Sequence, residues 1–474
     1  MNILFVSTEA VPFAKTGGLG DVIGSLPSEL IKKGADARVM LPLYKSIKDE
    51  YAQSMVFHRA FTVDLGWRSC YCGVFSMEYN EVIFYFIDNE QYFYRDGYYG
   101  HFDDGERFAY FCKASLEALK YLDFDPDILH CNEWQSALVP VFMKTQYNDN
   151  EYYRKLKTVF TIHNIEYQGV YGKELASDIL GIDKKDADIV MMNGDVNYMK
   201  GAIVTCDRLT TVSPSYAEEI TYPFYACGLH SIIEENRYKL SGIINGIDYK
   251  VYNPYRDKAL TVNYSKNSPG KKKINKHHLR EELGLDTGFE GPLLAMIGRL
   301  AEHKGLPLIT AVFDEIMNEP VQFVMLGTGE LAHEDFFRKK AGQYKGRVAA
   351  ITAFSATLAS RIYAGADIFL MPSISEPCGL AQMIALRYGT IPVVRATGGL
   401  KDSIKPYNPA TGRGNGVRFD SINAHDMLDA LKRVLNLYGQ PEHWDRIMKN
   451  AFNTDCSWKK SAVEYMRLYE SLMV

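Results

Sequence analysis

The segment Lys15-Thr16-Gly17-Gly18-Leu19-Gly20-Asp21 follows an apolar run, Ile3-Leu4-Phe5-Val6, and precedes a helical pattern that starts at Val22. A strand, a glycine-rich turn and a helix in this order are typical of a parallel α/β fold, whose ligands bind where the strands end. Such a turn presents backbone N–H groups to an anion, and Lys15 adds a mobile positive charge. The same residues also fit an ordinary tight turn with a surface lysine. Alone, the segment therefore predicts a loop that suits an anion and no particular ligand.

Short apolar runs alternate with helical patterns along the whole chain. This alternation is typical of parallel sheets covered by helices, and 474 residues are too many for a single core. We therefore predict an α/β fold of two Rossmann-like domains, over 1–243 and 244–456, and a closing amphipathic helix over 457–474 that packs back on the first domain. The predicted strands cover 3–7, 37–41, 82–87, 127–131, 158–162, 209–212, 241–244, 293–297, 321–326, 347–352, 367–371 and 391–394.

Composition narrows the class of protein. A net charge of -5 disfavours nucleic acid as the main partner. The eight cysteines are scattered, which favours reduced thiols over disulfides, and neither a cleavable leader nor an apolar run of membrane-spanning length is visible. We therefore expect a cytoplasmic protein that binds no membrane. The polar, basic stretch 262–278 is interpreted as a solvated connection, with a phosphate site as the less favoured alternative.

A basic loop follows the predicted strand 293–297. Its sequence, Gly298-Arg299-Leu300-Ala301-Glu302-His303-Lys304-Gly305, places Arg299 and Lys304 at one strand end. Two cations there could neutralise a diphosphate as it leaves a substrate. The alternative is a surface loop whose charges are merely solvated.

A single carboxylate follows the predicted strand 367–371, in the turn Glu376-Pro377-Cys378-Gly379-Leu380. The N–H groups at the start of the next helix could hold a phosphate while Glu376 binds neutral hydroxyls. The alternative is that Glu376 only caps that helix. Two further polar strand ends are His163-Asn164 and the segment from His130 to Gln135, which contains Glu133.

Two motifs do not support a function. The segment Asp123–Asp127 imitates a calcium loop, but Ile128 replaces the required glycine. The turn Gly327-Thr328-Gly329 resembles a dinucleotide fingerprint, but the next predicted strand ends without the acidic residue that binds ribose. This weakens a nicotinamide-dependent oxidoreductase without removing it.

Taken in order, the motifs resemble the bacterial glycogen synthase and plant starch synthase family, and the likeness covers nearly the whole chain. Several long motifs in one order are far more specific than a glycine triplet. The matching segments are 15–22, His163-Asn164, 244–248, 298–300 with Lys304-Gly305, 361–367, 376–380 and 397–400.

The resemblance implies a retaining glycosyltransferase with two Rossmann-like domains that face each other across a cleft (glycosyltransferase-B type). It implies glucosyl transfer from ADP-glucose, a substrate rather than a cofactor, to the non-reducing end of an α-1,4-glucan such as glycogen, with no metal. By the likeness, the catalytic residues are His163, Glu376, Arg299 and Lys304. The donor-binding residues are Lys15, Gly17, Gly18, Asp21, Asn245, Phe354, Cys378, Gly379, Leu380 and Thr397. The acceptor residues are Tyr94, Arg95 and Glu133.

Two positions depart from the family pattern. Glu133 stands where the family usually has Asp, and we expect its extra methylene to move the carboxylate outward; Gln135 stands where His is common. The alternatives are a transferase that uses UDP-glucose or another acceptor, a nicotinamide oxidoreductase, and a catalytically silent glucan-binding protein. Nothing in the sequence specifies an oligomeric state.

Overall fold

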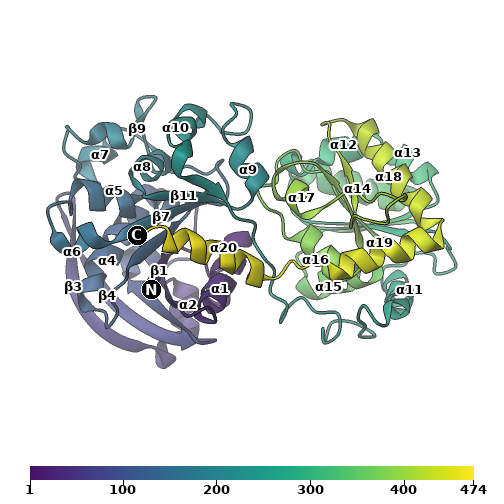
Figure 1. Cartoon of the computed structure of the whole chain (residues 1–474), viewed down its shortest axis with the longest axis horizontal. Coiled ribbons are helices and arrows are strands. Elements are labelled where there is room, and N and C mark those ends of the chain that lie inside the picture. Colours follow the sequence, from purple (N-terminus) through teal and green to yellow (C-terminus); the bar gives the residue numbers. More distant parts are fainter. Residues whose placement is uncertain (474) are drawn as a thin grey trace. The chain divides into compact units, whose positions relative to one another are not determined.

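The computed structural model describes residues 1–473 and contains two compact α/β units. Unit 1 comprises residues 1–243 together with the closing segment from Trp458, and unit 2 comprises Ile244–Ser457 (Figure 1). Each unit is built on its own, mainly parallel sheet. The predicted α/β class with two Rossmann-like domains is confirmed. None of the helices within residues 1–473 combines the length and the apolar character needed to span a bilayer.

The sheet of unit 1 is parallel except at one edge, where β3 and β4 form a long antiparallel hairpin and β4 pairs antiparallel with β5. Strand order reverses between β1 and β6, which lie side by side in the middle of the sheet. In spatial order the strands are β12 (Leu240–Gly242), β11 (Arg208–Thr211), β7 (Lys157–Ile162), β6 (Ile128–Asn132), β1 (Asn2–Val6), β2 (Asp36–Pro42), β5 (Val82–Asp88), β4 (Arg68–Tyr79) and β3 (Val56–Leu65).

Two groups of helices cover this sheet. Helix α1 (Gly18–Ile31) packs against α20 (Trp458–Glu470), whereas α4 (Asp104–Ala118), α5 (Leu138–Thr145) and α8 (Tyr198–Thr205) pack against one another. The Tyr469 hydroxyl of α20 bonds His130 Nδ1 in β6 at 2.7 Å, which ties the closing helix to the centre of the sheet. The remaining elements are α2 (Lys45–Tyr51), α3 (Glu90–Phe93), α6 (Glu151–Lys155), α7 (Leu175–Asp178), α9 (Pro214–Glu219), α10 (His230–Glu235) and a small sheet of β8 (Val170–Tyr171), β9 (Met191–Met192) and β10 (Asp195–Asn197).

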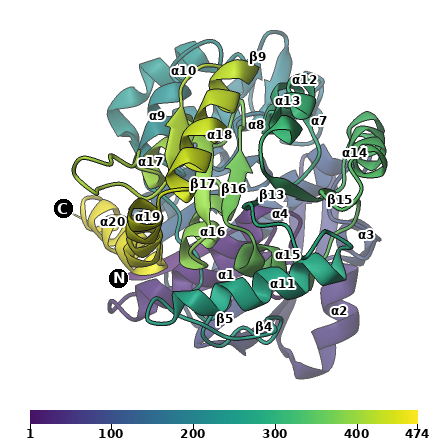
Figure 2. The same ribbon diagram turned by 90° about the vertical axis from the view of Figure 1, so that its right-hand side faces the viewer.

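The sheet of unit 2 is entirely parallel, and its strand order reverses between β13 and β16. Helices α13 and α18 lie on one face and α11, α15 and α16 on the other (Figure 2). The strands, in spatial order, are β15 (Val348–Ile351), β14 (Gln322–Leu326), β13 (Leu293–Ile297), β16 (Ile368–Met371), β17 (Ile391–Arg395) and β18 (Val417–Phe419). The helices are α11 (Lys272–Glu282), α12 (Leu306–Ala311), α13 (Phe313–Asn318), α14 (Leu331–Gln343), α15 (Ala356–Gly365), α16 (Ala381–Arg387), α17 (Gly398–Ser403), α18 (Ala424–Tyr438) and α19 (Pro441–Asn453).

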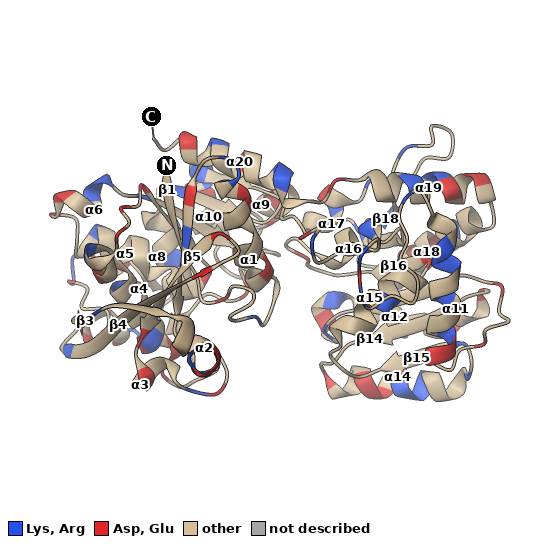
Figure 3. Cartoon of the chain, turned by 90° about the horizontal axis from the view of Figure 1, so that it is seen from below, with Lys and Arg blue, Asp and Glu red and all other residues tan. Residues whose placement is uncertain are grey.

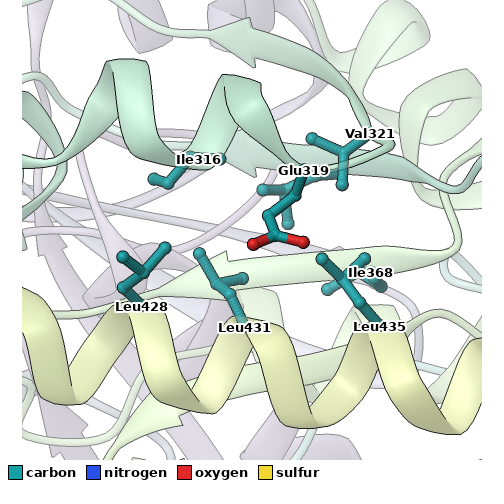
Figure 4. A pocket seen from close by; sticks show the side chains of 8 residues that line it. Ile316, Glu319, Val321, Ile368, Leu428, Leu431 and Leu435 are labelled. Atoms are coloured by element: carbon teal, nitrogen blue, oxygen red, sulfur yellow. The ribbon is translucent and has the colours of Figure 1, made fainter.

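The core of unit 2 between β13, α13 and α18 is closely packed. A cavity of about 10 Å³, barely enough for one water molecule, is lined by Leu294, Ile316, Leu431 and their neighbours. Glu319 extends over it toward α18 (Figure 4). On the surface, acidic and basic residues are interspersed on both units in the view of Figure 3.

The predicted strands hold within two residues at each end, but the sequence did not anticipate β3, β4, β18, the small sheet of β8 to β10, or the helix that begins at Lys272. The hairpin of β3 and β4 was missed because Val56–Arg59 are all exposed, so no apolar alternation marks the strand. The interpretation of 262–278 as a solvated connection is wrong from Lys272 onward, where α11 begins. Lys272 is buried, and its ammonium donates to the carbonyls of Tyr363 and Ala364, which end α15. The lysine side chain thus supplies hydrogen bonds to carbonyls at the end of a helix. The composition of the segment could not reveal this contact.

Candidate active site

The polar loops of unit 2 meet where its strand order reverses. In open parallel sheets, ligands bind outside the carboxyl ends of the strands at this point. The loop after β13 carries Arg299 and Lys304, and the loop after β16 carries Glu376. Because β13 and β16 are neighbours, the two loops leave the sheet side by side.

Backbone contacts hold these two loops together. The amide of Ile374 donates to the carbonyl of His303 at 2.8 Å. Gly305 has a φ of 76°, and a Cβ there would collide with the carbonyl oxygen of Pro372, so only glycine allows this approach. The tight packing fixes the position of Lys304, which immediately precedes Gly305.

Glu376 is 6% exposed and accepts two hydrogen bonds, from Lys304 Nζ at 2.7 Å and from Ser373 Oγ at 3.0 Å. The alternative that Glu376 only caps the next helix is wrong. The residue before α16 is Leu380, and no side chain caps that end. Glu376 therefore presents a carboxylate oriented by a cation and a hydroxyl.

Arg299 differs from Lys304 in its surroundings. Its side chain is exposed, and no residue within 1–473 forms an ion pair or hydrogen bond with it. The predicted pair of cations therefore consists of one lysine bound to Glu376 and one arginine available to a ligand.

A third loop, Thr397 to Leu400, packs on the backbone of the Glu376 turn. The Gly399 amide donates to the carbonyls of Glu376 and Pro377, at 3.2 and 3.1 Å. A Cβ on Gly398 or Gly399 would collide with that turn, which explains the paired glycines. Thr397 is buried at the start of α17.

Cys378 is part of this turn, and Asn245 contacts its thiol through a backbone amide. Burial raises the pKa of the Cys378 thiol to about 12, although the backbone amide of Asn245 opposes the shift, so the group stays a neutral thiol. Asn245 is buried, and its Oδ1 has no hydrogen-bond partner within residues 1–473. A buried acceptor without a partner suits a hydroxyl of a ligand. Gly379, with a φ of 70°, and Leu380 complete the turn, and Phe354 lies elsewhere, 91% exposed, on the loop that precedes α15.

In unit 1 the glycine-rich loop is organised around an acidic residue that the sequence did not point to. Glu9, which is 3% exposed, accepts from the amides of Thr16 and Gly17 at 2.7 and 3.2 Å. The Gly17 amide, predicted to face a donor, is thus already bound within the chain. Gly18 begins α1 and keeps an N–H with no intrahelical partner.

Lys15 and Asp21, at the two ends of this loop, form an ion pair at 2.7 Å. The pKa of Asp21 is raised because burial outweighs the attraction of Lys15. The pair keeps a mobile cation beside the start of α1.

Glu133 does not project outward, which corrects the expectation drawn from its extra methylene. It adopts a φ of 65°, and its carboxylate turns inward to accept from the amides of His163 and Asn164 at 2.6 and 2.7 Å. Burial raises its pKa to about 8, against the opposing effect of these amides. A carboxylate placed in this way shapes the His163 loop, and an acceptor role for Glu133 stays a prediction.

His163 is oriented by Asn132. The Asn132 amide nitrogen donates to the His130 carbonyl at 3.0 Å, so its oxygen faces His163 Nε2, also at 3.0 Å. Because that oxygen only accepts, Nε2 carries the hydrogen and Nδ1 is left as an acceptor. Burial lowers the pKa of His163 to about 3, so the ring is neutral near pH 7.

The predicted acceptor residues Tyr94 and Arg95 lie on the loop after α3, and both are engaged within the chain. The Tyr94 hydroxyl donates to Asp49 at 2.9 Å. Both terminal nitrogens of Arg95 bond Asp103, at 2.6 and 2.8 Å. The Arg95–Asp103 pair closes the loop on itself.

The dinucleotide-like turn has a packing explanation. A Cβ on Gly327 would collide with the Gly298 carbonyl, and one on Gly329 with the Leu300 carbonyl. The Leu300 amide also donates to Thr328 at 2.9 Å. These glycines therefore allow the basic loop to pack closely, which removes the main argument for an oxidoreductase.

The acidic segment 123–127 leads into β6, as expected for a loop. Asp127 accepts from the amide of Asn2 at 2.7 Å, and this edge borders an open hollow of about 550 Å³ that also includes Arg38 and Asp36. The hollow lies at the amino ends of β1 and β2, away from the edge where α/β folds bind ligands. Within residues 1–473, no three His, Cys, Asp or Glu side chains are grouped to hold a metal ion.

The sequence matches two family models and resembles known proteins over its full length. The model of the starch synthase catalytic domain family matches residues 2–235, and that of the glycosyl transferases group 1 family matches residues 279–453. A glycogen synthase of Geobacillus thermodenitrificans is 47% identical over 475 residues, covering 100% of this chain and 98% of its own. One of Desulforamulus reducens is 48% identical, covering 100% and 99%.

Solved structures with a similar fold include a starch synthase and a sucrose-phosphate synthase. The catalytic domain of starch synthase IV from Arabidopsis thaliana, bound to ADP and acarbose, superposes with a TM-score of 0.90 at 33% identity, covering 99% of this chain and 98% of that one. A sucrose-phosphate synthase from Thermosynechococcus elongatus reaches a TM-score of 0.63 at 16% identity, covering 100% and 99%, which supports the fold alone.

Proposed function

The chain belongs to the glycogen synthase and starch synthase family of glycosyltransferases, and on this premise we propose that it transfers glucose from ADP-glucose to the non-reducing end of an α-1,4-glucan with retention of configuration. The resemblance predicted from the sequence is thereby confirmed, and the oxidoreductase and the silent binding protein are set aside. The observation that carries the proposal is the Glu376 carboxylate held by Lys304, together with an exposed Arg299 on the same loop as Lys304 that has no ion-pair partner within residues 1–473.

Departure of the diphosphate is the step that needs positive charge. The bond from the glucose anomeric carbon to the phosphate oxygen breaks, and negative charge develops on that oxygen. We assign the stabilisation of this charge to Arg299 and Lys304. Since two cations supply it, we expect activity to persist in EDTA. A loss of activity that only a divalent metal restores would contradict this assignment.

Recognition of the glucose falls to the turn after β16. Glu376 is oriented to accept from sugar hydroxyls. The backbone amides of Cys378, Gly379 and Leu380 belong to the same turn, and we assign them to the glucose as well. The unpartnered Oδ1 of Asn245 offers one further acceptor.

The configuration at the anomeric carbon is retained if the acceptor hydroxyl attacks that carbon from the same face that the phosphate leaves. Retaining glycosidases instead use a second carboxylate as nucleophile. In the proposed route, the bond between the acceptor oxygen and the anomeric carbon forms as the phosphate bond breaks, and the acceptor proton passes to the leaving phosphate oxygen. His163 is neutral in this scheme, since its pKa of about 3 leaves the ring near pH 7 without the second proton that an imidazolium would give as a general acid. A trapped covalent glucosyl-enzyme would contradict this route.

In unit 1 we assign Lys15, Asp21 and the Gly18 amide to the donor phosphates, and the loop of Tyr94 and Arg95 to the glucan. The exposed ring of Phe354 is assigned to the adenine, because an aromatic ring in water gains by stacking on a base. We propose a cytoplasmic location, where such a donor would be available.

The decisive experiment supplies labelled ADP-glucose or UDP-glucose together with glycogen and measures label in polymer. We expect incorporation from ADP-glucose. Incorporation from UDP-glucose alone would replace the donor assignment, and none from either would refute the proposed function.

A further inference from the structure

The carboxylate of Glu9 is shared by two loops of unit 1. Its Oε2 accepts from the Thr16 and Gly17 amides, and its Oε1 accepts from the Thr16 hydroxyl at 2.6 Å and from the Tyr99 hydroxyl at 2.9 Å. No lysine, arginine or histidine within residues 1–473 forms an ion pair with it. The glycine-rich loop is thus organised around an anion that belongs to the chain itself.

Tyr99 belongs to the other loop, which follows α3 and ends at α4. Burial raises the pKa of its hydroxyl well above the usual value, so the group keeps its proton and donates to Glu9. The same hydroxyl lies 2.9 Å from Thr8 Oγ1. The ring packs against Phe108 in α4, with centroids 6.0 Å apart.

The loop of Tyr99 is held by hydrogen bonds at both of its ends. Arg95 and Asp103 close it with two hydrogen bonds, and Arg107 of α4 donates to the carbonyl of Tyr98 at 3.1 Å. A loop fixed in this way transmits a displacement of Tyr94 or Arg95 to Tyr99 instead of absorbing it. The bond from Tyr99 to Glu9 then transmits it to Thr16 and Gly17.

We propose that Glu9 is a positioning residue, and that its bond to Tyr99 couples glucan binding at the loop from Tyr94 to Asp103 to donor binding at the loop from Lys15 to Asp21. The proposal rests on the function proposed above, which assigns the two ligands to these loops. Glu9 touches neither ligand in this scheme. It holds the backbone next to the Gly18 amide and Lys15, which we assign to the phosphates. By thermodynamic linkage, binding of either ligand then raises the affinity of the protein for the other.

The first experiment measures the Kd of ADP by calorimetry with and without saturating acarbose. With ADP as the only nucleotide, no glucose is transferred to acarbose during the measurement. For the wild type we expect acarbose to lower the Kd of ADP by about fivefold or more, the usual range of coupling between sites. Tyr99→Phe keeps the ring but removes the bond, so the two Kd values should become equal. A wild-type ratio of one, or a wild-type ratio retained in Tyr99→Phe, would overturn the proposal.

Tyr153→Phe is the matched control. Its hydroxyl donates to the Leu116 carbonyl at 3.0 Å, and it too is a tyrosine hydroxyl bonded inside unit 1. Leu116 lies roughly 18 Å along α4 from Asp104, at 1.5 Å per residue. We expect this variant to keep the wild-type ratio, whereas an equal loss in both variants would indicate general loosening and contradict a specific bridge.

The second experiment follows amide hydrogen exchange in the peptide that contains Thr16 and Gly17. In Glu9→Gln, one carboxylate oxygen is replaced by an amide NH2 group, which cannot accept from the donors that face it. Amide exchange of Thr16 and Gly17 should therefore accelerate by about tenfold, the effect of losing one buried charge-assisted hydrogen bond. Unchanged exchange would overturn the role of Glu9. If Glu9→Gln does not fold, the Tyr99→Phe binding measurement still decides.

The two proposals fail in different ways. A wild type that transfers no glucose from labelled ADP-glucose would refute the proposed function, and the exchange rates would still test the anchoring by Glu9. An active wild type whose Tyr99→Phe variant keeps the full ratio would refute the bridge alone.

Discussion

Lys304 and Glu376 form a partly buried ion pair, with Nζ 2.7 Å from Oε2, although 72 positions separate them in the chain. Without a donor, the lysine neutralises the carboxylate that we assign to the glucose hydroxyls. In the function proposed above, the same lysine shares its charge with a donor phosphate. The pair therefore keeps both groups in position and spares each from being left unpaired.

Lys304→Ala should reduce kcat/KM for ADP-glucose by a factor that corresponds to about 2–4 kcal/mol, the range for losing one preorganised electrostatic contact. Initial rates with glycogen as acceptor measure this. Lys340→Ala is a matched control, because Lys340 pairs with Asp314 on another part of unit 2. A wild-type rate in Lys304→Ala would refute its assignment.

Glu376→Ala should abolish most turnover while the melting temperature changes little, since we propose that the residue binds the donor glucose, and it fills no apolar core. Glu376→Gln should restore part of the activity, because an amide oxygen can still accept from a hydroxyl. Rates and thermal melts by circular dichroism are compared for the two variants. Full activity in Glu376→Ala, or unfolding at room temperature, would contradict this role.

Phe354→Ala should raise KM for ADP-glucose by about tenfold with kcat nearly unchanged, since stacking on a base contributes about 1–3 kcal/mol of binding. The loss should be smaller for UDP-glucose, whose pyrimidine stacks over less area. Leu331→Ala, which removes another exposed apolar side chain of unit 2, serves as the control. An unchanged KM in Phe354→Ala would place the adenine elsewhere.

Acid should destabilise the protein through His130. Burial lowers the pKa of this histidine to about 3, from an ordinary value of 6.5. Between these values the unfolded chain takes up a proton that the folded one refuses, so stability is complete above pH 6.5 and falls as the pH drops toward 3. At pH 5 the loss is about 2 kcal/mol, from 1.36 kcal/mol per pKa unit.

Urea unfolding at pH 7 and pH 5 measures this loss, with His130→Gln as the variant that takes up no proton. His163 adds to the same trend, while the raised pKa of Glu133 acts in the opposite direction, and both remain in the variant. The difference between wild type and variant therefore isolates His130. An equal acid shift in both would show that another group is responsible.

Most strands and the loops between them could be predicted because the signals are local. A buried strand in a parallel sheet is a short apolar run, and Gly17, Gly305 and Gly398 each mark a close turn next to one. The hairpin of β3 and β4 escaped because its outer residues face solvent. The helix from Lys272 escaped because its lysines suggested solvent, whereas Lys272 is buried against the end of α15.

The candidate site divides in the same way. Amino-acid order alone placed Arg299, Lys304, Glu376 and Lys15 at strand ends, because the strand, turn and helix signals around each are contiguous in the chain. Tertiary structure decided which groups share a bond: Lys304 with Glu376, Glu133 with the amides after β7, and Glu9 with both Thr16 and Tyr99. Glu9 and Tyr99 lie 90 positions apart, and no spacing or composition relates them. Such partners meet only because the sheet brings the ends of distant strands to one edge, where burial favours a hydrogen bond for most polar groups.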